Sequence, residues 1–429
     1  MTFSLSPTLA TNERIQARID AGHSIVHMAF GEAGLPVHPL LARALAEAAS
    51  HNGYAPVMGT ARARRAVAGY FERRGLPTDP DLVVLAPGSK PLLFALLRAL
   101  PGDVLLPSPS WVSYEAQAAL VGTRVIRVPI PRETGGIPDA DALEQRIAQA
   151  RRQGQQPAVL VVTMPDNPTG TVAPRSSLER VCAVAANAGL TVVSDEIYRD
   201  LTFDQGSFTS PAALYPEGTV VTAGLSKNLA LGGWRIGFAR LPHTPAGWEL
   251  REAISGIASE IWSCLAAPMQ EVAALGLDEP EELRLHIEAS RRLHATVARA
   301  VHSIFVEAGA TCRSPQAAFY LYPDFEPLRD RLETMGVSGG VELAELLLER
   351  YDIAVLAGAA FGDDPRALRF RVSTSLLYGS TPEQRWQALD AADPLALPWV
   401  AESLEEIRDA LGAVSGQRPN RPERRSPVV

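Results

Sequence analysis

One lysine near the middle of the chain stands in a setting that would make its amine reactive. Lys227 lies in the stretch AGLSKNLALGGWRIGF, residues 223–238, among small and apolar neighbours. Arg235 follows eight residues later, behind a Gly-Gly-Trp turn. A desolvated amine can form a Schiff base with an aldehyde, and an arginine can hold a phosphate. The pair therefore favours a site for a phosphorylated aldehyde, with a purely structural apolar loop as the alternative.

Polar and aromatic residues also follow three predicted strands, where parallel strands present their ligand-binding edge. Trp111 could stack on a flat ring, although a core tryptophan is the simpler explanation of that residue alone. Asn167, fixed between prolines, is a rigid hydrogen-bond donor. Asp195 could hold a protonated ring nitrogen, and Tyr198 could reach an oxygen of the same ring. Their succession along the chain favours a single site over separate structural turns.

A further candidate is the turn Gly-Ser-Lys-Pro at residues 88–91, which follows a predicted strand and opens a helix predicted at residues 92–100. Proline is tolerated in the first turn of a helix, because the N–H that it lacks would have no partner there. The free N–H groups of such a turn bind anions. Ser89 and Lys90 are therefore candidates for an anion site, with an ordinary strand-to-helix turn as the alternative.

Short β-branched runs alternate with longer amphipathic segments through the first half of the chain. Several runs are apolar on both faces, which is typical of a sheet covered by helices on both sides. A capping box at residues 176–179 predicts a helix that ends at Gly189. We therefore expect an α/β fold with a mostly parallel sheet. The predicted strands cover residues 82–86, 104–107, 124–129, 158–164, 190–194, 219–222 and 236–239.

The pattern changes after residue 247, where helix formers dominate and strand-like pieces return only beyond residue 306. This change predicts a second, smaller α+β domain. The expected bounds are 1–45 for an N-terminal lid segment that is also part of the small domain, 46–285 for the large domain, 286–398 for the small domain and 399–429 for a C-terminal extension, of which 416–429 is expected to be disordered.

The composition describes a globular chain with an acidic balance. Of 429 residues, 46% are hydrophobic and 21% charged, and the formal net charge is -8. We therefore expect no nucleic-acid partner, and no apolar run approaches the length of a membrane span. The three cysteines are odd in number and far apart, so we expect no disulfide framework, no metal site and a reducing cytoplasm. The N-terminal residues do not have the pattern of a signal peptide.

Taken together, the motifs DNPTG, DEIY, SK and GWRIG resemble those of the fold-type I pyridoxal-phosphate aminotransferases, most closely the class I/II, aspartate aminotransferase-like group. The matching motifs run from residue 31 to residue 373. The resemblance implies that the large domain binds pyridoxal 5'-phosphate and that the chain moves an amino group from an L-amino acid to a 2-oxo acid. It also implies a homodimer with shared active sites.

The resemblance implies a role for each cofactor-binding position. Lys227 would form the Schiff base and move the substrate proton, and Asp195 would keep the ring nitrogen protonated. Trp111 would stack on the ring, and Asn167 and Tyr198 would hydrogen-bond to its phenolate oxygen. The phosphate would be surrounded by Ser89, Lys90 and Arg235, with Tyr54 reaching over from the neighbouring subunit.

On the substrate side, the resemblance implies that Arg371 and Asn167 bind the α-carboxylate, with a backbone N–H from Gly31 in a mobile lid. Arg369 lies two residues before Arg371 and, in a strand, would point the same way. Lys90 is placed either to reach a distal carboxylate or only to balance the phosphate charge. An acidic substrate, aspartate or glutamate, is therefore the first expectation.

Two positions depart from the family pattern. The usual Gly-Glu-Pro-Asp-Phe near the lid reads Gly-Glu-Ala-Gly-Leu at residues 31–35, which predicts a more flexible loop. The hydroxyl often found three residues before the lysine is replaced by Gly224, so either Ser226 or Thr222 supplies it or the phosphate has one contact fewer.

Two other functions stay open from the sequence alone. The altered lid fits a different reaction with the same cofactor, such as an elimination, a cyclisation or an oxidation in a biosynthetic pathway. A non-catalytic ligand sensor of the transcription-regulator type is the second, but about 30 residues before the lid motif leave little room for its DNA-binding domain.

Overall fold

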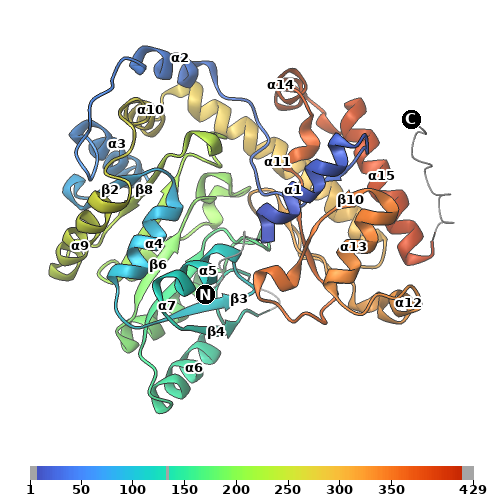
Figure 1. Cartoon of the computed structure of the whole chain (residues 1–429), viewed down its shortest axis with the longest axis horizontal. Helices are drawn as coiled ribbons and strands as arrows, with labels where there is room; N and C mark the ends of the chain where they lie inside the picture. Colours follow the sequence, from blue (N-terminus) through green and yellow to red (C-terminus); the bar gives the residue numbers. More distant parts are fainter. Residues whose placement is uncertain (1–6, 132–134, 418–429) are drawn as a thin grey trace.

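The computed structural model describes residues 7–131 and 135–417. The expectation of disorder over residues 416–429 falls almost wholly outside this part of the chain. Figure 1 shows two regions side by side: a sheet with its covering helices, and a second group built largely from the C-terminal half.

The first region is organised by a seven-stranded sheet in the order β2-β8-β7-β6-β5-β3-β4. β8 runs antiparallel to both of its neighbours, and the other pairs are parallel. The predicted mostly parallel α/β sheet is therefore confirmed. The strands are β2 (Val83–Ala86), β3 (Asp103–Ser108), β4 (Val125–Pro129), β5 (Pro157–Thr163), β6 (Thr191–Asp195), β7 (Thr219–Gly224) and β8 (Gly237–Arg240).

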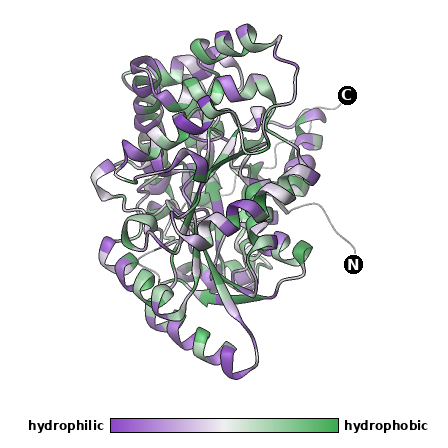
Figure 2. Ribbon diagram, turned by 90° about the vertical axis from the view of Figure 1, so that its left-hand side faces the viewer, coloured by the Kyte–Doolittle hydropathy of each residue, from purple (hydrophilic) through white to green (hydrophobic). Residues whose placement is uncertain are grey.

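Helices cover both faces of this sheet, which explains why its strands are apolar throughout. In β5, Val159 and Val161 pack under one set of helices, while Leu160 and Val162 pack under the other, because successive side chains of a strand point to opposite faces. In Figure 2 the helices carry both hydrophobic and hydrophilic residues along their turns. One set is α4 (Ser89–Ala99), α5 (Val112–Val121) and α9 (Pro245–Ile261); the other is α3 (Ala61–Glu72), α6 (Ala140–Arg152), α7 (Arg175–Ala188) and α10 (Ala267–Asp278), with α2 (Pro39–Ala48) packed on α10.

Two helices begin earlier than their sequences predict. α7 starts at Arg175 after Pro174, with no side-chain cap, so the predicted capping box at 176–179 is wrong. Glu179 instead pairs with Arg175 at 2.8 Å, since residues four apart meet on a helix face. α4 starts at Ser89 rather than at residue 92, so the Gly-Ser-Lys-Pro turn forms its first turn. The predicted end at Gly189, in the left-handed conformation, is confirmed.

The second region has its own hydrophobic core, to which distant parts of the chain contribute. The long helix α11 (Glu281–Glu307) leads into it, and Val26, Met28 and Leu35 from the N-terminal segment pack in the same cluster. Its other helices are α1 (Pro7–Asp20), α12 (Arg329–Thr334), α13 (Gly340–Tyr351), α14 (Pro382–Asp390) and α15 (Pro398–Ser415), and its strands are β1 (Val26–His27), β9 (Tyr320–Leu321), β10 (Ile353–Ala354), β11 (Leu356–Ala357) and β12 (Phe370–Ser373).

Helix α15 bears on the extent of this region. Val400, Leu404, Ile407 and Leu411 are buried in the same core as α11. We therefore propose that the smaller domain extends to residue 415 and not only to residue 398. Along the described ranges, none of the helices has the length and apolarity needed to cross a membrane.

Candidate active site

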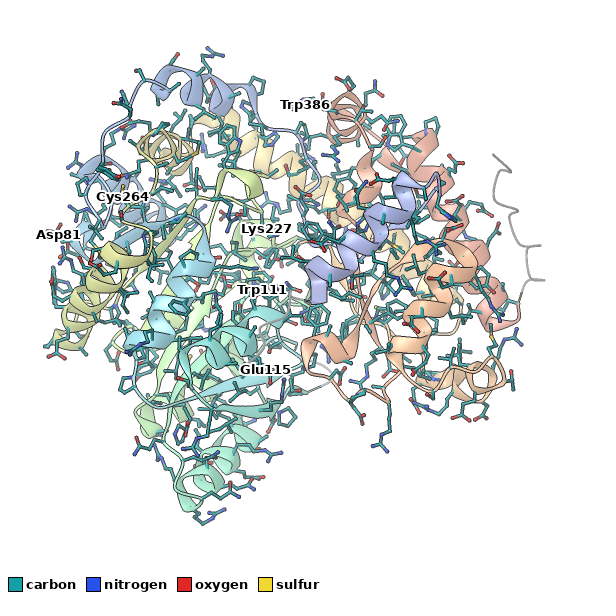
Figure 3. All side chains as sticks on the ribbon, in the orientation of Figure 1. Asp81, Trp111, Glu115, Lys227, Cys264 and Trp386 are labelled. Atoms are coloured by element: carbon teal, nitrogen blue, oxygen red, sulfur yellow. The ribbon has the colours of Figure 1, made fainter. Side chains whose placement is uncertain are left out.

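A cavity of about 520 Å³ opens at the carboxyl ends of the sheet strands, where the second region meets them. Figure 3 places Lys227 and Trp111 near the middle of the molecule, between the two regions. All the predicted site residues except Tyr54 line this cavity. They are Gly31, Ser89, Lys90, Trp111, Asn167, Asp195, Tyr198, Ser226, Lys227, Arg235 and Arg371.

Lys227 follows β7, and its Nζ donates a hydrogen bond to the carbonyl oxygen of Gly31. Burial, followed by the nearby charge of Arg371, lowers the pKa of Lys227 to about 8. Arg235 acts in the same direction, while Glu32 and Asp195 oppose the shift. A lysine with this pKa has a sizeable neutral fraction near pH 7, and the neutral amine is the form that attacks an aldehyde.

Asp195 ends β6 and leaves one oxygen free for a ligand. Its Oδ2 accepts a hydrogen bond of 2.8 Å from the Tyr114 hydroxyl. Its Oδ1 is buried, and none of the described residues hydrogen-bonds to it. Burial raises the pKa of Asp195 to about 6, although the Tyr114 hydroxyl and the charge of Lys227 oppose the shift, and a further cationic donor would stabilise the charged form. A buried acceptor without a partner is costly, and a protonated ring nitrogen would satisfy it.

The sequence did not single out Tyr114, although it follows Trp111 by three residues in α5. Its hydroxyl also lies 2.7 Å from Thr163 Oγ1 at the end of β5. Trp111 is the N-cap of α5 and Tyr114 lies in its first turn, where its backbone N–H bonds to the Trp111 carbonyl, so closeness to Trp111 was the available signal.

The turn before α4 forms a tight cradle with Arg235. Gly88 has a φ of +92°, and a Cβ placed there would lie 2.1 Å from Arg235 Nη2, so only glycine fits. The same turn packs against Gly237 of β8. Ser89 stands at the N-terminus of the helix, where backbone N–H groups favour an anion. A guanidinium and a helix start thus face one end of the cavity.

Gly224 has a structural reason for lacking the expected hydroxyl. A Cβ there would lie 2.7 Å from the carbonyl oxygen of Ile236, so no side chain fits between β7 and the following segment. Of the two residues that could replace the hydroxyl, Ser226 lines the cavity, whereas Thr222 is buried in the sheet and does not.

Arg371 of β12 is a buried cation that has no acidic partner within the described part of the chain. Only 1% of its surface is exposed, and its guanidinium donates to Asn167 Oδ1 at 3.2 Å and to the carbonyl oxygen of Ala29 at 2.6 Å. The rings of Tyr320 and Phe361 lie 4.9 and 5.0 Å from it. No carboxylate of the described residues lies within ion-pair distance. The arrangement suits an anion that enters from the cavity.

Arg369 does not line this cavity, although it lies two residues before Arg371 in the same β-ladder. It pairs with Asp363 at 2.9 Å and with Asp324 at 3.4 Å, beside a separate cavity of about 320 Å³. Residue 369 forms an antiparallel bridge with Asp324 that continues the register of β9 and β12, so the expected alternation of side chains holds. Arg369 instead lies two residues further along the strand, about 7 Å away, which places it beside the other cavity.

Tyr320 also lines the cavity, although the sequence did not identify it as a candidate site residue. Its hydroxyl lies 2.8 Å from that of Tyr198, and it belongs to β9, which pairs with β12. No motif marks it, because it reaches the cavity only when the second region folds against the sheet.

The lid segment at residues 31–35 is held by many contacts, where the sequence led us to expect a more flexible loop. Ala33 is 1% exposed, and a Cβ on Gly34 would lie 2.1 Å from the carbonyl oxygen of Ser375. A Cβ on Gly31 would lie 2.3 Å from the Tyr320 hydroxyl. The small residues of the altered motif therefore allow close packing against the second region. Tyr54, by contrast, is 94% exposed and lies outside its own chain's cavity.

Both lysines of the chain line this cavity. Every other basic side chain except histidine is an arginine, and only Lys90 and Lys227 carry an amine. Lys90 Nζ lies 5.3 Å from the ring of Trp111, and partial burial and the charge of Arg235 lower its pKa.

The fold and this cavity are those of a large family. The family model "Aminotransferase class I and II" matches residues 29–377, and the chain belongs to that family. Its members are transaminases that depend on pyridoxal phosphate, so this chain is such an enzyme and transfers amino groups with that cofactor. A different reaction with the cofactor is not favoured.

Individual relatives agree with this assignment. The chain is 32% identical over 86% of its length to the aspartate/prephenate aminotransferase of Cereibacter sphaeroides, of which it covers 91%. It is 30% identical over 87% of its length to the aspartate aminotransferase of Geobacillus stearothermophilus, with 93% of that protein covered. Among solved structures, the aspartate aminotransferase from Thermus thermophilus with maleate superimposes with a TM-score of 0.78 at 29% identity, over 90% of this chain and 96% of that one.

Proposed function

We propose that this aminotransferase takes its amino group from aspartate or glutamate and passes it to a 2-oxo acid, with 2-oxoglutarate as the first candidate. The observation that carries the proposal is Arg371, a buried guanidinium without a carboxylate partner among the described residues, in the same cavity as Lys227. The names of the similar proteins add support, since several are aspartate aminotransferases.

The residues present fit pyridoxal phosphate. The free Oδ1 of Asp195 offers an acceptor for a ring N–H, and the cradle of Gly88 and Arg235 offers donors for a phosphate. Trp111 offers a flat face, and Tyr198 offers a hydroxyl. When bound, this cofactor withdraws electrons from the α-carbon of an amino acid.

Lys227 would act twice in this scheme. Its nitrogen would hold the aldehyde carbon of the cofactor covalently. Once the substrate amine has displaced it, the free Lys227 amine would take the proton from the substrate α-carbon and deliver it to that cofactor carbon. A pKa near 8 suits both steps, because the group must give up and regain a proton near neutral pH. The hydrogen bond to Gly31 places the amine between the lid and the sheet.

Arg371 and Asn167 would bind the α-carboxylate of the substrate. The guanidinium can present two N–H groups to the two carboxylate oxygens, which lysine cannot do. Asn167 already accepts from Arg371, so it holds the guanidinium in place for the substrate. Gly31 would add a backbone N–H from the lid side.

Lys90 would bind the second carboxylate of an acidic substrate. The composition supports this role over a purely charge-balancing one. The chain uses arginine nearly everywhere, yet keeps a lysine at this position in the cavity. Lysine reaches a carboxylate as a mobile point charge, whereas arginine would serve a fixed phosphate as well or better.

A homodimer with shared sites is part of the proposal. Tyr54 is a large aromatic residue with 94% of its surface exposed, as expected if it enters a partner's cavity. Mixing an inactive Lys227→Ala chain with an inactive Tyr54→Ala chain should restore activity through hybrid dimers. Full activity of the Tyr54→Ala protein alone would contradict the shared site.

We also propose that the enzyme works in the cytoplasm. All three cysteines are free, and burial raises the pKa values of Cys182 and Cys312 to about 12, which suits unreactive thiols. Tagging the chain in cells and separating their compartments would test this.

The proposal is tested by adding single amino acids to the cofactor-loaded protein and following its visible absorbance. Aspartate or glutamate should convert the cofactor to its amine form, and 2-oxoglutarate should reverse the change. Alanine and leucine serve as controls for the acidic side chain. Equal conversion by alanine would contradict the assignment of substrate, and no conversion by any amino acid would contradict transamination.

A further inference from the structure

The hydroxyls of Tyr198 and Tyr320 form a buried pair at the wall of the cavity. Their oxygens lie 2.8 Å apart, and the rings are 3% and 1% exposed. Tyr198 comes from the segment after β6 and Tyr320 from β9, so the pair joins the sheet to the second region.

The two hydroxyls share one hydrogen bond, and which of them donates depends on where their two protons lie. Burial raises the pKa of both phenols, so each hydroxyl keeps its one proton at neutral pH. One of the two protons must lie between the oxygens, because the distance is that of a hydrogen bond. Among the described residues, neither hydroxyl has another hydrogen-bonding partner. Gly31 packs so closely on Tyr320 that a Cβ would lie 2.3 Å from its oxygen. Both tyrosines line the cavity. A phenolate oxygen bound beside Tyr198 can only accept, so it would take the proton of Tyr198, and the proton of Tyr320 would then lie between the two hydroxyls.

Resting on the proposed cofactor role of Tyr198, we infer that Tyr320 is a positioning residue whose hydroxyl donates to Tyr198, so that Tyr198 donates to the ring oxygen of the bound cofactor. A hydroxyl that accepts one hydrogen bond becomes a stronger donor in the next. Tyr320 thus strengthens a contact that it does not itself make.

The ring of Tyr320 has a second and separate task. The Arg371 guanidinium lies 4.9 Å from its centroid, on the side of the substrate carboxylate. A cation over a desolvated ring is stabilised by the ring electrons. One residue therefore supports the cofactor through its oxygen and the substrate clamp through its ring, and two substitutions can separate these effects.

The first test removes only the oxygen. In the cofactor-loaded Tyr320→Phe protein without substrate, the visible absorbance is titrated against pH to obtain the pKa of the cofactor-bound Lys227 nitrogen. A weaker hydrogen bond from Tyr198 leaves more negative charge on the ring oxygen, which holds the nitrogen proton more firmly. We expect this pKa to rise by about 0.5 unit, since a chained hydrogen bond loses only part of its strength.

A matched control is available two residues further on. The Tyr322 hydroxyl donates to Asp363 Oδ2 at 2.8 Å, beside the other cavity. Tyr322→Phe removes a partly buried hydroxyl that is hydrogen-bonded away from the larger cavity, and should leave the pKa of the Lys227 nitrogen unchanged.

The second test removes the ring as well, with maleate as a dicarboxylate probe of the loaded protein. Tyr320→Phe should bind maleate within about twofold of the parent, and Tyr320→Leu about tenfold more weakly, as loss of a desolvated cation–ring contact implies. Equal Kd values for the Phe and Leu variants would overturn the role of the ring.

The two proposals fail in different ways. If Tyr198→Phe raises the pKa and Tyr320→Phe does not, the hydroxyl chain is wrong while the proposed function stands. If the Lys227→Ala protein keeps the same pH-dependent absorbance, the cofactor is not held by Lys227, and the proposed function itself is wrong.

Discussion

Arg369 and Arg371 stand two residues apart and end in cavities of opposite character. Arg369 faces Asp363 and Asp324 beside the cavity of about 320 Å³, so its charge is already balanced. Arg371 is buried beside the cavity of about 520 Å³ without a carboxylate partner among the described residues. A buried charge without a counter-charge is costly, and such a cost is tolerated where a ligand supplies the missing charge.

The comparison shows that the neighbours of an arginine decide whether its charge is available to an anionic ligand. Both arginines have the same side chain and nearly the same place in the sequence. The difference lies in their neighbours: two carboxylates face Arg369, whereas an amide oxygen, a carbonyl and aromatic rings face Arg371. The charge of Arg371 in the larger cavity is therefore available to a ligand, whereas that of Arg369 beside the smaller cavity is already paired.

The largest effect should come from the amine in the larger cavity. Lys227→Ala should lower kcat by about 10⁴-fold, because both covalent attachment and proton transfer depend on it. Borohydride reduction followed by peptide mass spectrometry should locate the cofactor on Lys227, with Lys90 as the only other lysine in the chain. Lys90→Ala is the matched control and should keep the covalent label. A label on Lys90 in the parent protein would refute the assignment.

The next effect separates the two arginines directly. Arg371→Ala should lower kcat/KM for aspartate by about 10²- to 10³-fold, as expected when one member of a buried charge pair is removed. Cofactor loading, measured by absorbance, should be unchanged. Arg369→Ala should keep kcat/KM within about threefold, because its partners lie beside the other cavity. If the two variants lose activity equally, the contrast between the cavities fails.

A smaller effect concerns the pKa of Lys227 in the protein without cofactor. The rate of covalent cofactor attachment should rise with pH and reach half of its maximum near pH 8, since only the neutral amine reacts. The charge of Arg371 lowers this pKa, so Arg371→Met should move the midpoint to higher pH. Arg369→Met should leave the midpoint in place. A midpoint near the ordinary lysine value of about 10.4 in the parent protein would contradict the buried setting.

The smallest effect is on stability. Arg369→Ala should lower the free energy of unfolding by about 1 kcal/mol, because its ion pairs are partly exposed and screened by solvent. Denaturant titration would measure this, with the exposed Arg366→Ala as control. A loss of several kcal/mol in the free energy of unfolding would contradict this prediction, because it would mean that the charge of Arg369 is buried and essential to the fold.

The local sequence patterns predicted most of the strands and strand-end site residues of the first region. The apolar runs identified the sheet, and Asn167 and Asp195 were expected at strand ends because parallel strands bring their carboxyl ends to one edge. The start of α7 was not predicted correctly, since a Ser-x-x-Glu pattern can occur inside a helix as well as at its cap.

The contacts across the two regions were much less predictable. Tyr320 meets Tyr198, and Gly31 meets Lys227, over separations of 122 and 196 residues. No local period or motif reports such contacts, since they depend on how the second region docks on the sheet. The same docking packs the altered lid motif, residues 31–35, against the second region.

The amino-acid sequence was thus enough to nominate the candidate groups: an amine, a carboxylate expected to face the cofactor ring, a turn expected to bind phosphate, and two arginines. Their chemistry follows from side-chain type and from the strand or helix end on which each stands. Among the described residues, the three-dimensional packing then decided which arginine has no carboxylate partner, which oxygen of Asp195 has no hydrogen bond and which hydroxyl lies beside that of Tyr198. Burial and counter-charge are properties of neighbours in space, and those neighbours come from distant parts of the sequence.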